Sequence, residues 1–333
     1  MASINTNPSA MTALQSLHVT NKALAVVQGR ISTGLRVAEA KDNAAYWSIA
    51  TTMRSDNKVL ATVQDTLGLG ASRVDTAYTA LESTLDLVSD MRQKILAAIG
   101  KDPSGKDQIQ QEISAIQAQL ESMARSATFS GQNWLAVNAS ETNGHPAEGV
   151  HRPVEIVSSF SRGHTGAIEL GMIEIDVDRI KLYDDAATTN ETKGLLEGLR
   201  LASTGKRDDT AEAPATPGAD AEATDGYAVA SLSVSGYSDD QLKDMLSVVD
   251  ATLKEMTDAA TSIGAAKKRI DLQKDFGSNL MDSIDRGVGQ LVDADMNKES
   301  TRLQALQVQQ QLGIQSLSIA NSNAQNILSL FRQ

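Results

Sequence analysis

The stretch that decides the fold lies near the N-terminus and reads LHVTNKALAVVQGRISTGL over residues 17–35. Positions three or four residues apart in it form one seam: Leu17, Asn21, Leu24, Gln28, Ile31 and Leu35. This spacing places the side chains along one side of an α-helix, as in helices that pair with other helices. Because a lone helix leaves such a seam open to water, the sequence predicts a partner helix for this segment.

The same spacing recurs in four further segments. Residues 44–98 would form one helix about 80 Å long, at a rise of about 1.5 Å per residue. Glycine and proline in residues 100–105 end it, and a third helix follows with apolar positions from Ile109 to Met123. A fourth long helix covers residues 242–291. The last seam continues almost to the end of the chain and includes Leu303, Leu306, Leu317, Ile327 and Phe331.

The pattern changes between the two helical halves. Apolar residues alternate with polar ones in three runs: Val154, Ile156 and Phe160; Ile168, Leu170 and Met172; Ile173, Ile175 and Val177. A period of two predicts strands, and the change of phase at Met172 predicts a bulge or a bend there. Residues 205–226 are rich in Thr, Ala, Asp, Glu, Pro and Gly without periodicity, so we expect an exposed loop.

The predicted fold class is therefore mainly α. Long antiparallel helices from both chain ends pack as coiled coils, and a small β-rich region, with a hairpin and an outer insert, occupies the middle. Both chain ends are helices that cannot bury their seams alone. We therefore expect them to pair with each other or with neighbouring copies.

Composition excludes several classes of function. The formal net charge is −12 and the basic residues are not clustered, so neither nucleic acid nor an anionic membrane is an expected partner. The chain has no cysteine, which excludes disulfides and thiolate metal sites. Its first eight residues do not form a general secretory signal, and no apolar run reaches the roughly 18 residues that a membrane-spanning helix needs.

Candidate catalytic and ligand sites are weak. His145, His151 and His164 lie near acidic residues, but their spacing fits no helical or tight-turn metal site, so no metal or other cofactor is expected. Thr204-Gly205-Lys206 is similar to the end of a phosphate-binding loop, but Arg200 and Arg207 stand where such a loop needs glycine and a hydroxyl residue. No serine-hydrolase or dinucleotide motif is present, so an enzyme is not expected.

Two segments at opposite ends of the chain carry a family resemblance. Residues 28–37, QGRISTGLRV, followed by AKDNAA at 40–45, resemble the N-terminal signature of bacterial flagellins. Residues 291–296, LVDADM, and 318–332, SIANSNAQNILSLFR, resemble the C-terminal signature of the same family. Phe129 to Asn133 is similar to the family's turn after its third helix, and Tyr46-Trp47-Ser48 resembles flagellins of the rhizobium and agrobacterium group.

The resemblance implies a structural subunit that polymerises through paired terminal helices into the flagellar filament used for swimming. The subunit would be secreted, unfolded, through the flagellar type III export apparatus. Its implied partners are further copies of itself, sibling flagellins, an export chaperone, the filament cap and hook-junction proteins. It also implies five parts, with inner-core helices at 1–43 and 291–333, a helical shell domain at 44–137 and 238–290, and a β-hairpin and variable surface-exposed region at 138–237.

Several polar residues are further candidates for contacts. Arg30, Arg36, Lys41 and Asp42 lie where the first helix gives way to the second. We expect them to form inter-subunit contacts, the alternative being that they solvate a linker. Asn21, Gln28 and Gln310 in the seams are costly to bury unless paired, so they either fix the register or face an open channel.

Two residues of the second helix bear on recognition by hosts. Many flagellins present an arginine and a leucine to an animal Toll-like receptor in a stretch similar to Val88–Ala97. Asp90 and Lys94 stand at the corresponding places here. An anion replaces a cation and a charge replaces an apolar contact, so we expect poor activation of that receptor.

Three alternatives compete with the filament subunit. A hook-filament junction protein would share the terminal helices but form a short ring. A secreted coiled-coil binding module would use the middle region to recognise a ligand. An enzyme displayed on a helical scaffold would hold its site in residues 138–237, where no catalytic constellation is found.

Overall fold

The computed structural model of the chain describes residues 7–138, 153–163, 167–187, 189–213, 222 and 224–330, but not the side chains of residues 323–330. The chain divides into two compact units. The terminal unit comprises Met1–Val59 and Asn279–Gln333, and the central unit comprises Leu60–Ser278. The helices α2 (Ala44–Ala98) and α4 (Asp239–Val292) each contribute to both units.

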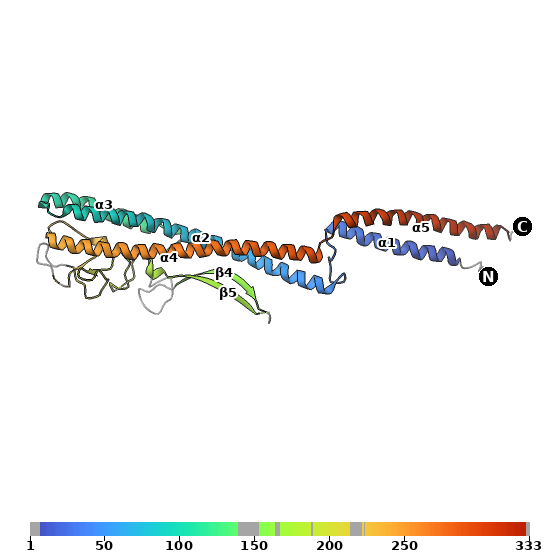
Figure 1. Cartoon of the computed structure of the whole chain (residues 1–333), viewed down its shortest axis with the longest axis horizontal. Helices are drawn as coiled ribbons and strands as arrows, with labels where there is room; N and C mark the ends of the chain where they lie inside the picture. Colours follow the sequence, from blue (N-terminus) through green and yellow to red (C-terminus); the bar gives the residue numbers. More distant parts are fainter. Residues whose placement is uncertain are drawn as a thin grey trace. The chain divides into compact units, whose positions relative to one another are not determined.

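The terminal unit is built around the pair of helices α1 (Pro8–Thr33) and α5 (Met296–Leu330), which lie side by side (Figure 1). Asn7 caps the start of α1 by accepting a hydrogen bond from Ala10 N, and Gly34 ends the helix at a φ of 72°. The side chain of Asn7 donates to Ala320 O at 2.9 Å, whereas Arg30 contacts Glu299. The two helices therefore run antiparallel.

A short backbone junction connects the two helix pairs of the terminal unit. The amides of Arg36 and Val37 both donate to Val292 O, at 2.7 and 3.2 Å, and Leu35 forms a β-bridge with Asp293. Beneath this junction lies a small hydrophobic core formed by Val37, Ala50, Val288 and Val292. This packing fixes the linker after α1 against the last turns of α4.

The core of the central unit follows a strict seven-residue repeat. In α2 the repeat consists of five buried residues: Leu67, Val74, Leu81, Val88 and Ile95. In α4 it consists of Leu242, Val249, Met256, Ile263 and Ile270, also buried. A sustained repeat of seven keeps one face of a helix against its partner, which is the basis of coiled-coil packing. Asp75 pairs with Lys267 and Gln64 bonds to Lys274 O, so α2 and α4 run antiparallel. The predicted mainly α, coiled-coil fold is confirmed.

Polar residues within these seams are satisfied locally. The hydroxyl of Thr84 donates to Leu81 O and that of Thr252 donates to Val248 O, both at 2.8 Å. Buried hydroxyls that return a hydrogen bond to their own helix avoid the cost of an unpaired donor. The third helix, α3 (Pro103–Ser126), adds Ile113, Leu120 and Ala124 to the same core.

The predicted hairpin is formed by β4 (Val154–Arg162) and β5 (Ile168–Ile175), an antiparallel pair (Figure 1). The register shifts between Val157 and Ser159, so the bulge lies on β4, opposite Met172. Extending the third strand run to Val177 was wrong, because Val177 begins the 3-10 helix η1 (Val177–Arg179). Asp176 accepts a hydrogen bond from Asp178 N and turns the chain there.

Short strand pairs complete the central unit, and their sequences carry no period. They are β1 (Thr128–Phe129) with β2 (Gln132–Asn133), β3 (Ala136–Val137) with β6 (Tyr183–Asp184), and β7 (Arg200–Leu201) with β8 (Gly226–Tyr227). The pair β3–β6 is parallel and the other two are antiparallel. A second 3-10 helix, η2 (Val229–Ser231), follows β8.

The prediction of an exposed loop over residues 205–226 was wrong for part of that stretch. Gly205, Ala211 and Asp225 are buried. A side chain at Gly205 would lie 2.6 Å from the Cβ of Ala251 in α4, so the chain approaches the helix closely there. Small residues with paired backbone groups can pack in this way without an apolar pattern.

An ion pair at the start of α4 gives a pH dependence to the central unit. Lys106 is buried and donates to Asp239 Oδ1 at 2.8 Å, and Gly100 N donates to Asp239 Oδ2 at 3.2 Å. The Lys106 hydrogen bond, with that of Gly100, lowers the pKa of Asp239 below its ordinary value. The stabilisation is therefore complete above about pH 3.9, the ordinary pKa of Asp, and is lost as the pH falls through the lower folded-state pKa.

We expect Asp239→Asn to lower the urea midpoint of unfolding at pH 7 and to have a much smaller effect at pH 2. The matched control is Asp240→Asn, because Asp240 pairs with Lys243 at the surface. Urea unfolding followed by circular dichroism at both pH values measures the difference. Equal losses at the two pH values would show that the Asp239 charge contributes nothing.

Candidate polymerisation surface at the chain ends

The predicted seam residues face one another within a single chain. Seven of them are half-buried between α1 and α5 or at the junction: Leu17, Leu24, Ile31, Leu35, Leu303, Leu306 and Leu317. The side chain of Ile327 and all of Phe331 lie outside the described residues. A role of these residues in polymerisation stays a prediction.

One seam position differs from the predicted pattern. Val27, only 2% exposed, is the fully buried residue of α1, whereas Gln28 is exposed. Val27 lies three residues after Leu24 and four before Ile31, so it fits the spacing as well as Gln28 does. Its apolar character was the signal that could have identified it.

Polar contacts and a close approach fix the register of the pair. Gln310 Nε2 donates to Asn21 Oδ1 at 2.7 Å, so these two polar seam residues are paired. A Cβ added at Gly313 would lie 3.2 Å from Leu17 Cδ1, which brings the helices close at that point. Because a shift of α5 would separate both pairs, they specify the alignment of the two helices.

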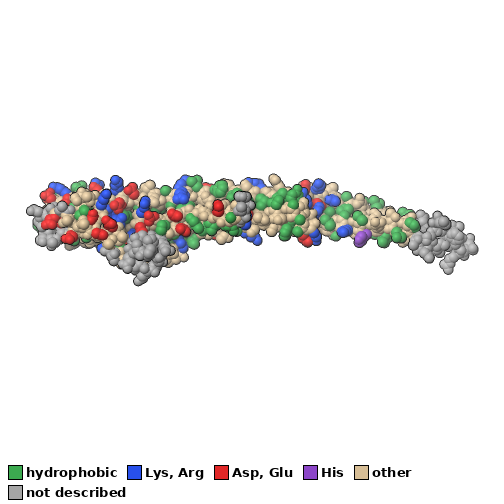
Figure 2. Space-filling view, turned by 90° about the horizontal axis from the view of Figure 1, so that it is seen from below, with side chains coloured by type: hydrophobic (Ala, Val, Ile, Leu, Met, Phe, Trp, Pro, Cys, Tyr) green, Lys and Arg blue, Asp and Glu red, His purple; other side chains and the backbone are tan. Residues whose placement is uncertain are grey.

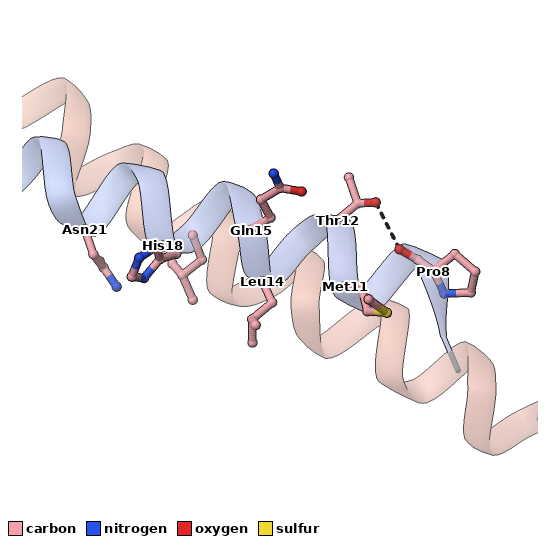
Figure 3. Close-up of a pocket in the computed structure, with 8 residues that line it drawn as sticks. Pro8, Met11, Thr12, Leu14, Gln15, His18 and Asn21 are labelled. Carbon is pink, nitrogen blue, oxygen red and sulfur yellow. Dashed lines mark hydrogen bonds between the residues drawn. The ribbon is translucent and has the colours of Figure 1, made fainter. Parts of the chain in front are cut away.

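Large apolar side chains outside the seam remain exposed on the same helix pair. We call eight of them the outer face: Met11, Leu14, Val19 and Val26 of α1 and Val308, Leu312, Ile314 and Ile319 of α5. At about 100° per residue, Val308, Leu312 and Ile319 lie opposite the Leu303–Leu317 seam. Figure 3 shows Leu14 and Gln15 pointing to opposite sides of α1. Both residues belong to the lining of a hollow of about 1000 Å³ along this helix.

The four polar candidates are engaged within the chain. Arg30 forms an ion pair with the buried Glu299 at 3.2 Å, and Arg36 donates to Leu291 O at 2.9 Å. Lys41 contacts Glu39 at 2.6 Å. Asp42 accepts from the amides of Glu39 and Ala38, which lowers the pKa of its carboxyl group. Their inter-subunit role stays a prediction.

The other candidates lie elsewhere. Asp90 is exposed on α2, and Lys94 is paired with Glu112 of α3 at 2.5 Å, so the expected weak receptor recognition stays a prediction. His145, His151 and His164 lie outside the described residues. Within the described ranges, no group of three His, Asp or Glu residues is arranged to hold a metal ion, and no helix is long and apolar enough to cross a membrane.

A core built on seven-residue repeats and two chain ends that pair as antiparallel helices define the class of protein as a helical structural subunit. The apolar outer face on those chain ends is a surface of the kind that proteins use for association.

Comparison with known proteins identifies the family. Residues 4–140 match the bacterial flagellin N-terminal helical region, and residues 246–331 match the bacterial flagellin C-terminal helical region. The chain is 46% identical over 334 residues to Flagellin C of Rhizobium meliloti strain 1021 and 43% identical over 334 residues to a flagellin of Brucella melitensis. It is 40% identical over 404 residues to Flagellin A of Rhizobium meliloti, and each comparison covers all of both chains. The chain belongs to the bacterial flagellin family.

The protein is thus a structural subunit of the flagellar filament, an extracellular polymer of the motility apparatus. The resemblance to flagellins of the rhizobium group is confirmed. The family supports the filament subunit over the hook-filament junction protein and the binding module.

Proposed function

We propose that this flagellin polymerises through its paired chain ends, and that the two surfaces of the helix pair have different roles. The half-buried seam holds α1 against α5 within each chain. The outer face then contacts other copies. The supporting observation is that the eight large apolar side chains of the outer face stay exposed in the single chain, among them Leu14 at 59% and Leu312 at 55% exposure.

Burial of apolar surface would drive this association. Apolar area removed from water contributes about 25 cal/mol per Å², so the exposed side chains of the outer face gain little until a partner covers them. In a family whose members form filaments, further copies of the chain are the partner that fits.

The organisation of the chain and its partners are part of the same proposal. Residues 1–43 and 291–333 form the inner core, 44–137 and 238–290 form a helical shell, and 138–237 face outward. Charge supports this arrangement, because the central unit carries 34 acidic against 20 basic residues, and the terminal unit carries 8 against 10. The export chaperone, type III export apparatus, filament cap, hook-junction proteins and sibling flagellins are its proposed partners. No catalytic role is proposed for this structural protein.

Deleting residues 318–333 tests the role of the chain ends. The truncation removes Ile319 from the outer face, and Ala320, whose carbonyl accepts from Asn7. We expect full-length protein seeded at neutral pH to form long tubes and the truncated protein to stay monomeric, with reduced helicity in α1. Sedimentation, negative-stain microscopy and circular dichroism measure these properties. If both proteins polymerise alike, or if both remain monomers, the paired-ends mechanism is wrong.

A further inference from the structure

One face of the β4–β5 hairpin is apolar and open. Successive side chains of a strand point to opposite faces, and the buried Ile173 and Ile175 mark the inner face of β5. Ile156, which pairs with Ile173, lies against α2, because a Cβ added at Gly70 would be 2.7 Å from Ile156 Cγ2. The opposite face of β5 points away from this contact. It carries four exposed residues: Ile168, Leu170, Met172 and Glu174.

This open face is apolar along most of its length and ends in a charge. Phe160 and Val157 of β4 pair with Leu170 and Met172, so they lie on the same face of the hairpin. Glu174 lies at the base of the hairpin. Figure 2 views the molecule from the side on which the hairpin lies in Figure 1, and it shows apolar side chains grouped there beside charged ones. We call Leu170, Met172 and Glu174 the hairpin face.

A second exposed apolar surface lies on α4. Leu272 and Phe276 are 57% and 58% exposed, and residues four apart are neighbours on a helix. The exposed Arg269 stands within about 60° of both, at about 100° per residue. The buried seam residues Ile263 and Ile270 point to another side of α4. We call Arg269, Leu272 and Phe276 the α4 stripe.

The hairpin face and the α4 stripe match in spacing and in charge. The two apolar residues of the stripe lie about 6 Å apart along the helix, at about 1.5 Å per residue. Those of the hairpin face lie about 6.6 Å apart along the strand, at about 3.3 Å per residue. One end of the stripe carries Arg269 and one end of the hairpin face carries Glu174. Across the part of the chain that the structure describes, neither of these two residues forms an ion pair.

We propose that the hairpin face of one copy packs on the α4 stripe of the next copy in the filament, with Glu174 beside Arg269 at the rim. Both surfaces belong to the central unit, and they are different patches of one chain. A contact between two different patches leaves one of each uncovered on every pair of copies, so it continues from copy to copy, as a filament requires. This contact is additional to the one proposed for the chain ends, and it rests on membership of a filament-forming family.

Cross-linking of engineered thiols tests the contact directly, because the chain has no cysteine of its own. Filaments of Met172→Cys/Leu272→Cys are treated with a short bismaleimide, since backbones packed about 10 Å apart are beyond the reach of a disulfide. We expect a ladder of covalent oligomers on a denaturing gel. A mixture of the two single variants should stop at dimers, because each chain then holds one thiol. The matched control is Met172→Cys/Leu96→Cys, since Leu96 is exposed on α2 and lies outside the stripe.

Products confined to single chains, or a ladder no stronger than that of the control, overturn the proposal. Exchange of charge gives a second measurement. Glu174→Arg and Arg269→Glu should each raise the critical concentration for polymerisation about fivefold, because a surface ion pair becomes a pair of like charges.

An equimolar mixture of these two charge variants should polymerise like the wild-type protein, because every contact between one variant and the other again joins opposite charges. A mixture that polymerises no better than either variant alone contradicts the contact. Both tests report on contacts between central units. Their outcome is therefore independent of which face of the α1–α5 pair contacts other copies.

Discussion

Replacing Arg200 with alanine is expected to destabilise the central unit by about 3 kcal/mol, toward the lower end of the range for breaking a buried ion pair. The Arg200 side chain is completely buried and donates to both carboxylate oxygens of Glu255, at 2.9 and 2.8 Å. It also donates to Gly205 O at 3.1 Å and to Leu195 O at 3.3 Å. Its loss leaves two buried carbonyl groups without this donor and opens a cavity.

Two features keep the expected loss of stability at the low end of the range for a buried ion pair. Glu255 is 38% exposed, so its carboxylate can turn to water, and Arg207 remains 3.6 Å away as a second cation. Burial raises the pKa of Glu255, but the hydrogen bonds and charge of Arg200 outweigh it, so the folded-state pKa of Glu255 is lowered. This contribution to stability is present above the ordinary pKa of Glu and is lost as the pH falls through the lower folded-state pKa.

Urea unfolding at pH 7 measures the effect of Arg200→Ala. The control is Arg179→Ala, since the Arg179 side chain is 79% exposed and its pair with Asp176 is a surface contact worth about 1 kcal/mol or less. Hydrogen exchange should show new opening around Gly205 in the Arg200 variant. A loss no larger than that of the Arg179 control would mean that the buried cluster does not hold the segment in place.

The helical half of this fold is readable from sequence because one periodic signal is repeated many times. In α2 the predicted seam coincides with buried residues such as Leu67, Leu81 and Ile95, and the predicted span of 44–98 is the observed one. Each turn of a coiled coil repeats the same requirement for an apolar side chain, so single exceptions such as Gly70 do not hide it. Gly70 itself is explained only by the structure, where an added Cβ would lie 2.7 Å from Ile156 Cγ2.

The packing around Arg200 could not be predicted in this way. The strands β7 and β8 have two residues each, too few for a period, and a buried arginine looks like a surface residue in sequence. The neighbouring Thr204-Gly205-Lys206 is similar only to the end of a phosphate-binding loop. Gly205 instead lies in a turn with a φ of 68°, and its carbonyl oxygen accepts a hydrogen bond from Arg200. Glycine is favoured at this position by the positive φ, which is seen only in the tertiary structure.

The sequence predicted the candidate polymerisation surface only in part, because its periodic signal marks the seam and not the outer face. Seam periodicity selected residues such as Leu24 and Leu306 that hold α1 against α5 within one chain. It did not select the outer face, because Val308 and Leu312 lie off the seam, and a scattered exposed apolar residue is ordinary in any helix. The distinction between the two faces requires knowledge of which side the partner helix already covers.

Leu312→Asp is expected to raise the critical concentration for polymerisation at least 100-fold, which corresponds to about 2.7 kcal/mol. Leu312 is 55% exposed in the single chain, so the change should leave the monomer folded. In a filament whose copies meet at the outer face, the same position would place an unpaired carboxylate in an apolar contact, which costs several kcal/mol. The lost burial of the leucine adds about 1.5–3 kcal/mol.

The control is Gln311→Asp, which adds the same charge to the same helix about 100° away from Leu312. Sedimentation of seeded samples over a concentration series gives the critical concentration of each protein, and circular dichroism checks that each monomer is folded. If Leu312→Asp and Gln311→Asp polymerise alike, the outer face does not contact other copies. The seam residues would then have to form the contacts between chains as well as those within a chain. For that, α1 and α5 would have to separate before assembly. A selective loss with Leu312→Asp instead shows that other copies of the chain cover Leu312 in the filament.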